Sequence, residues 1–116
     1  MNKVKLSRNF YLYEFESPET KEVIIFDGLV SKLQLARDYV KKALVITSGY
    51  RTEKYNMLVG GKEKSQHRVG CAVDISVVNH QPFTLKSLLE QVGFKQVIYY
   101  KEKNFIHAAL FKKNPF

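Results

Sequence analysis

The sequence predicts a small α+β domain in which helices pack against an antiparallel sheet of about four strands. Three observations favour this class. Stretches with apolar residues at helical spacing alternate with short apolar runs, turn residues separate these elements, and two runs near the C-terminus flank a polar turn and can pair as a hairpin. The 116 residues contain no repeat or linker, so we expect one domain over residues 1–116 with a single core.

The first part of the chain is expected to hold an arm and a helix. Residues 1–20 are predicted to form an extended N-terminal arm that carries aromatic anchors and turns at 17–19. A helix is predicted over 27–42, with Asp27 as its cap and two lysines near its C-terminal dipole. The apolar residues that share one face of this helix are Leu29, Leu33, Ala36 and Val40.

A strand and a second helix are expected next. The run 44–47 predicts a short buried strand, and Thr52 can cap a helix that extends to about Val59. The expected apolar stripe of that helix is Tyr55, Leu58 and Val59. A pair of glycines, 60–61, ends it, and 62–68 is expected to be a loop.

The last part predicts a strand, a helix and a hairpin. Strand 71–78 has apolar residues at its odd positions, while its even positions begin with the small and polar Ala72, Asp74 and Ser76. A helix capped by Thr84 and closed by Gly93 follows. Its inward residues are Leu85, Leu88, Leu89 and Val92. Runs 96–100 and 105–111 are expected to pair around the turn 101–104.

Composition excludes several classes of protein. Hydrophobic residues make up 45% of the chain, with only 6 Gly and 3 Pro, which excludes a disordered or low-complexity protein. Apolar runs are a few residues long, so no membrane span is expected. The N-terminus lacks the apolar segment of a secretory signal peptide. The single cysteine, Cys71, cannot form an internal disulfide.

The net charge of +8 suits a polyanionic partner. Nucleic acid is one hypothesis, because neutralised phosphates supply most non-specific binding to it. The basic residues are scattered, with no run longer than two and no nucleic-acid-binding motif, so we expect no specific nucleic acid partner. A bacterial wall that carries carboxylates and phosphates fits the charge equally well.

Two histidines and one aspartate interrupt otherwise apolar segments. Asp74 stands within the strand 71–78, His67 precedes it by seven residues, and His107 is the one polar residue in the run 105–110. A buried carboxylate needs a counter-charge or a metal. Two imidazoles and a carboxylate would leave a fourth tetrahedral position open, as in catalytic zinc sites. The spacing also allows a core histidine, and an Asp74 that pairs with Arg51 or caps a turn.

The order of the surrounding residues resembles a known family. Ser48-Gly49-Tyr50-Arg51, then Ser65-Gln66-His67-x-x-Gly70-x-Ala72-x-Asp74, then Phe105-Ile106-His107 is similar to zinc D-alanyl-D-alanine carboxypeptidases and phage endolysin peptidases, which share the hedgehog-like fold. The resemblance implies an enzyme that cuts the stem peptides of peptidoglycan, with zinc-bound water as the nucleophile. It also implies that His67, Asp74 and His107 ligate Zn²⁺.

The resemblance assigns further residues to the substrate. Arg51 matches an arginine that holds a substrate carboxylate or carbonyl near the metal, a role that suits the planar guanidinium. Ser65 and Gln66 match polar residues that line the cleft. Without a signal peptide, the expected location is the host cytoplasm or a phage virion, from which the protein would act on the bacterial cell wall.

One position departs from the family pattern. The family has an Asp or Glu, the general base, three residues before the last histidine ligand, and this chain has Asn104 there, which leaves it a substrate-binding role. Glu102 is the nearest alternative catalytic carboxylate, although a solvated turn residue is the simpler interpretation. The competing hypothesis is a catalytically impaired zinc-binding module that recognises the wall or forms part of a phage particle.

Overall fold

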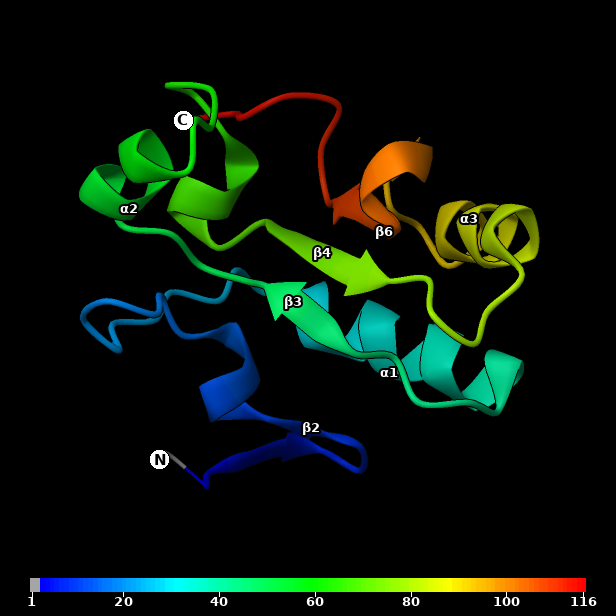
Figure 1. Ribbon diagram of the computed structural model, residues 1–116. Coiled ribbons are helices and arrows are strands. Elements are labelled where there is room, and N and C mark those ends of the chain that lie inside the picture. Colours follow the sequence, from blue (N-terminus) through cyan, green and yellow to red (C-terminus); the bar gives the residue numbers. More distant parts are fainter. Residues whose placement is uncertain (1–2) are drawn as a thin grey trace.

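The computed structural model describes residues 3–116, and a four-stranded antiparallel sheet with the order β3-β4-β6-β5 forms its centre (Figure 1). Its strands are β3 (Ile46–Ser48), β4 (Ala72–Ser76), β5 (Gln96–Tyr100) and β6 (Phe105–Ala109). The α-helices of the described residues are α1 (Leu29–Val40), α2 (Glu53–Leu58) and α3 (Pro82–Gln91). The predicted α+β class, the antiparallel sheet and the C-terminal hairpin are confirmed.

One face of the sheet is apolar and belongs to the core, together with α1 and α3. Alternate residues of β4 and β6 project to this face, and all four are fully buried: Val73, Ile75, Ile106 and Ala108. The helices contribute the buried residues Leu29, Leu33, Ala36, Leu85 and Leu89. These are the positions that the helical periodicity predicted, because the apolar stripe of a surface helix must face the core.

The opposite face of the sheet is polar at its centre. Asp74 of β4 pairs with His107 of β6 on one side and with Ser48 of β3 on the other. Since neighbours in register share a face of the sheet, these three side chains lie on the face turned away from the core. The even-numbered polar positions predicted for β4 therefore carry the candidate site.

The segment before β4 is a 3-10 helix, where the sequence predicted a loop. This element, η2 (Gln66–Val69), is capped by Ser65, whose hydroxyl accepts a hydrogen bond from the backbone N–H of His67 at 3.1 Å. Gly70 ends it in the left-handed conformation with φ 74°. A turn of helix holds His67 more firmly than a loop would, because its backbone is fixed at both ends.

The predicted apolar stripe of α2 is wrong. Thr52 caps this helix as predicted, but Leu58 is 78% exposed, Val59 is also exposed, and Asn56 is the buried residue. The helix is only six residues long and packs through a polar side chain. Asn56 donates a hydrogen bond to the carbonyl of Lys62 at 2.7 Å, and this bond compensates for the burial of its amide.

The predicted caps of α1 and α3 are also wrong. The residue at the start of α1 is Gly28, which has φ 93° and follows Asp27, and no side chain caps this helix. In α3 the cap is Gln81, whose side chain accepts a hydrogen bond from the N–H of Thr84 at 2.8 Å. The ring of Pro82 fixes its φ angle near the helical value, which suits the first turn of a helix, so α3 begins before Thr84.

Where an extended arm was predicted over residues 1–20, the structure has a hairpin and a short 3-10 helix, and residues 1–2 of that range lie outside the described residues. Strands β1 (Lys5–Ser7) and β2 (Phe10–Tyr11) pair antiparallel, and η1 (Leu12–Phe15) follows. The predicted turn after it is present, since the N–H of Lys21 donates to the carbonyl of Ser17 at 2.9 Å. The strand predicted over 44–47 as buried is instead an edge strand, and Val45 is 56% exposed. None of the helices within residues 3–116 combines the length and apolarity needed to cross a membrane.

Candidate metal centre

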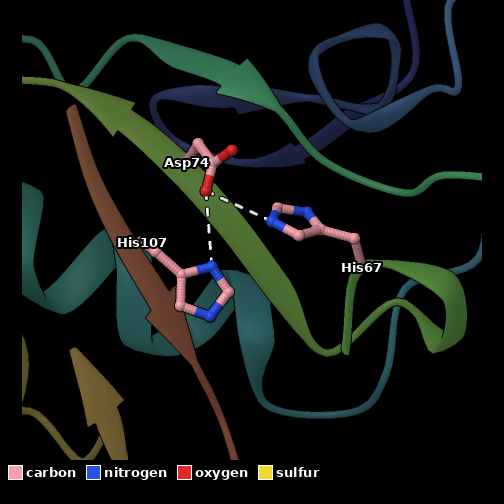
Figure 2. Close-up of side chains that lie close together, drawn as sticks. All are labelled: His67, Asp74 and His107. Atoms are coloured by element: carbon pink, nitrogen blue, oxygen red, sulfur yellow. Dashed lines mark hydrogen bonds and ion pairs between the residues drawn. The ribbon is translucent and has the colours of Figure 1, made fainter. Parts of the chain in front are cut away.

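The structure brings His67, Asp74 and His107 together, and Figure 2 shows both imidazoles turned toward the same carboxylate oxygen. Oδ1 of Asp74 lies 3.2 Å from Nε2 of His67 and 3.4 Å from Nδ1 of His107. One donor atom of each residue lies within 4.8 Å of the other two. Within residues 3–116 they form the one group of three or more such side chains with metal-binding geometry.

Three different elements position this triad. Asp74 stands at the middle of β4, the sheet register places His107 of β6 beside it, and η2 brings His67 over the end of the sheet. The backbone of η2 is joined to the segment after β3, because the N–H of Arg51 donates to the carbonyl of His67 at 3.0 Å. Two residues of the triad therefore lie on strands and the third on a hydrogen-bonded turn, and such elements hold side chains more precisely than free loops do.

The outer nitrogen of each ring also has a partner. Nδ1 of His67 lies 2.8 Å from the carbonyl oxygen of Gly49, and Nε2 of His107 lies 2.9 Å from Oε1 of Gln96. A carbonyl oxygen only accepts hydrogen bonds, so the outer nitrogens are the donors. Each ring then presents its other nitrogen to Asp74, where a proton or a metal ion can bind.

Asp74 is ionised at neutral pH. Burial alone would raise the pKa of its carboxyl, but the hydrogen bonds and attraction of His107 and His67 outweigh this effect and hold the pKa well below the ordinary 3.8. Its second oxygen, Oδ2, lies 3.2 Å from Nη2 of Arg51. The pair with Arg51 and the contacts with the histidines, which the sequence left as alternatives, therefore occur together on separate oxygens.

The residues fit a zinc ion. Zinc bonds of about 2.0–2.1 Å to nitrogen and oxygen in a tetrahedron place neighbouring ligand atoms about 3.3 Å apart. The two distances to Oδ1 of Asp74, 3.2 and 3.4 Å, agree with this spacing. Two imidazoles and one carboxylate are also typical ligands of catalytic zinc, which keeps a fourth position for water or substrate.

Arg51 is held at three points beside the triad. Its guanidinium group donates to Oγ of Ser48 at 3.1 Å, to Oδ1 of Asn56 at 3.3 Å and to Oδ2 of Asp74 at 3.2 Å. A Cβ on Gly61 would stand 2.0 Å from Oδ1 of Asn56 and 3.0 Å from Nη1 of Arg51. Gly61 therefore makes room for this network, while only its neighbour Gly60 has the positive φ of a helix end.

The two residues expected to line a cleft have structural partners. The hydroxyl of Ser65 caps η2. The buried amide of Gln66 bonds both backbone groups of Phe111, donating to its carbonyl at 2.6 Å and accepting from its N–H at 3.1 Å. These bonds join η2 to the segment that follows β6, so both side chains help to hold His67 in place.

The two residues considered for the missing base lie in the turn between β5 and β6. Glu102 is exposed in η3 (Lys101–Lys103) and does not join the triad. Asn104 follows with φ 57°, and its carbonyl accepts a hydrogen bond from the N–H of Val77 at 3.0 Å. Asn is among the few residues that adopt this left-handed conformation readily, so the turn itself accounts for it.

The third histidine is separate from the site. Nε2 of His80 lies 2.8 Å from the carbonyl of Ala43, near the other end of β4.

The sequence analysis gave no role in the site to three residues that support it: Ser48, Asn56 and Gln96. Ser48 and Gln96 lie on the same face of the sheet as the triad. The alternation along β3 and β5 could not indicate this before the register of the strands was known. The local pattern around Asn56 did not predict its burial, because a polar residue on a short helix is usually exposed.

Comparison with known protein families supports the resemblance. The model of the family described as Peptidase M15 matches residues 15–109, a stretch that contains His67, Asp74, His107 and Arg51. A comparison with curated proteins found no match.

Proposed function

The chain belongs to the peptidase M15 family, and on that premise we propose that it is a zinc metallopeptidase that acts on the peptides of bacterial peptidoglycan. The observation that carries the proposal is the convergence of two imidazole nitrogens and one carboxylate oxygen with zinc-like spacing. Residue 107 is far in sequence from residues 67 and 74, and a structural core alone would not require all three to meet.

His67, Asp74 and His107 would hold the zinc ion, with their lone pairs on the inner side of the site. Bound there, zinc supplies a Lewis acid that polarises a carbonyl and activates water. The chain supplies the orientation, since both rings and the carboxylate are fixed by further hydrogen bonds.

Arg51 would hold the substrate. A guanidinium group has five N–H donors, and the three named bonds leave two for a carboxylate or carbonyl of the peptide. Its attachment to Oδ2 of Asp74 would keep that substrate group next to the metal ligands. The net charge of +8 favours the approach of an anionic wall polymer.

The proposed hydrolysis is slow. Asn104 cannot exchange a proton near neutral pH, and loss of a general base costs about 10²- to 10⁴-fold in rate. Glu102 would have to leave its exposed position in the turn to serve as a catalytic base, and a second water molecule is the other candidate.

Elemental analysis of the purified protein tests the metal site. We expect zinc in the wild type and in His80→Ala, a control that removes a histidine outside the triad, and its loss in His67→Ala. The same samples are incubated with peptidoglycan and with D-Ala-D-Ala peptides, and only those with zinc should release product. Equal zinc in all three proteins, or none in the wild type, would contradict the proposal.

A wall-recognition module is the second candidate, and Asn104 is the observation that favours it. Asn104→Asp is suited to the test, because Asp also tolerates the left-handed conformation found there. A large gain in hydrolysis, within the 10²- to 10⁴-fold range, would identify an impaired enzyme. Tight wall binding with no gain would favour recognition alone.

A further inference from the structure

We propose that Gln96 is a positioning residue for His107: its side-chain oxygen accepts a hydrogen bond from the Nε2–H group and so directs the lone pair of Nδ1 toward the metal. This inference rests on the proposed zinc site. It adds a residue that no sequence motif indicated and gives it a role in metal binding that can be measured without an assay of activity.

The hydrogen bonds of Gln96 fix which end of its amide faces the ring. Its Nε2 donates to the backbone carbonyl of Lys112 at 3.2 Å, and its Oε1 lies 2.9 Å from Nε2 of His107. The carbonyl of Lys112 can only accept, so the NH₂ group must be on that side and the oxygen on the side of the histidine. The ring nitrogen opposite this oxygen is then the donor.

The sheet places the two residues within reach of each other. In the register of β5 and β6, Gln96 pairs with Ala109 and Ile98 pairs with His107. Residues two apart on a strand share a face, so Gln96 and His107 are diagonal neighbours on the same face of the sheet. Both side chains are partly buried, which favours a lasting hydrogen bond over exchange with water.

His67 is held in the same way by a different group. The carbonyl of Gly49 accepts from its Nδ1, as the amide oxygen of Gln96 accepts from Nε2 of His107. With both outer nitrogens held as donors, the two inner ring nitrogens and Oδ1 of Asp74 converge, so that a metal ion, or protons on those nitrogens, can bind between them. An amide oxygen orients the ring without adding a second negative charge beside Asp74.

Three variants separate positioning from other roles. Gln96→Met removes both hydrogen bonds at similar size, whereas Gln96→Glu keeps the acceptor for His107 and loses the donor to Lys112. Gln91→Met is the matched control, since Gln91 is exposed on α3. Zinc affinity is measured by competition with a chromophoric chelator, and folding is checked by circular dichroism.

We expect Gln96→Met to bind zinc about 10- to 100-fold more weakly, as when other residues that hydrogen-bond a metal-binding histidine are removed. Gln96→Glu and Gln91→Met should stay within a few-fold of the wild type. An unchanged Gln96→Met overturns the inference. Equal weakening in Gln96→Met and Gln96→Glu also overturns it, because the bond to Lys112 would then be the important one.

Nitrogen NMR of the zinc-loaded wild type gives a second readout. We expect the Nε2 proton of the His107 ring to be protected from exchange with water, and rapid exchange of that proton would overturn the inference even if Gln96→Met failed to fold. A wild type that binds no zinc refutes the proposed function, and this inference with it. A wild type that binds zinc but is insensitive to Gln96→Met refutes this inference alone.

Discussion

The two faces of the central sheet are built from neighbouring residues but stabilised by different means. Val73 and Ile75 face the core with no exposed surface, and Asp74 between them faces the candidate metal centre. The core face is stabilised by non-directional burial of apolar area. The site face depends on directional bonds in which each polar atom has a named partner. A register shift of one residue would exchange the two faces, so the core indirectly fixes the site.

The largest expected effect on stability comes from Ile106→Ala on the core face. The side chain is fully buried, and such truncations lower the free energy of unfolding by about 2–5 kcal/mol. Zinc bound per folded molecule should not change. Its neighbour His107→Ala provides the comparison, with zinc binding lost and a smaller change in stability. Denaturant titration and elemental analysis measure both quantities, and equal effects of the two variants would contradict the division between the faces.

Asp74→Asn should rank second. It removes the buried charge that His107, His67 and the partly buried guanidinium of Arg51 stabilise, and we expect a loss of about 3 kcal/mol in the metal-free protein, at the low end for a broken buried pair because an amide oxygen still accepts. The pKa of Asp74 is lower in the folded protein than its ordinary 3.8. The stabilisation is therefore fully present above that range and is lost as the pH falls below about 4.

Denaturant titration of wild type and Asp74→Asn from pH 7 to pH 3, with a chelator present, checks this prediction. The difference in unfolding free energy should shrink as the pH falls below about 4, where the carboxyl of the unfolded chain takes up its proton. A difference that fails to shrink below about pH 4 would show that the carboxyl is not stabilised in its ionised form.

Gly61→Ala should rank third, with a loss of stability of about 1–3 kcal/mol, because a Cβ would collide with Asn56 and displace Arg51. Gly60→Ala is the matched variant. No atom lies within 4 Å of its added Cβ, and the positive φ of 73° is the source of a loss of about 1–2 kcal/mol. Only Gly61→Ala should also weaken the binding of a D-Ala-D-Ala peptide, measured by calorimetry. Equal peptide affinity in both variants would show that Gly61 does not support the substrate-binding role proposed for Arg51.

Much of the fold followed from local patterns. The faces of α1 and α3, the cap Thr52 and the β5–β6 hairpin were predicted because each depends on residues close in sequence. The errors concern contacts that a helix makes with residues outside the helix itself. The burial of Asn56 depends on Arg51 and Lys62, and the exposure of Leu58 follows from it. The caps of α1 and α3 depend on how the chain enters each helix.

The amino-acid sequence by itself determined the alternation along β4 and β6 and the three side chains able to bind a metal, because period-two spacing and residue chemistry are local properties. Only the tertiary structure decided that both imidazoles meet one oxygen of Asp74, that Arg51 takes the other, and that Gln96 and Gly49 hold the outer ring nitrogens. Those contacts join residues from separate strands and turns. Hydrogen-bond direction depends on the sheet register, which no single segment specifies.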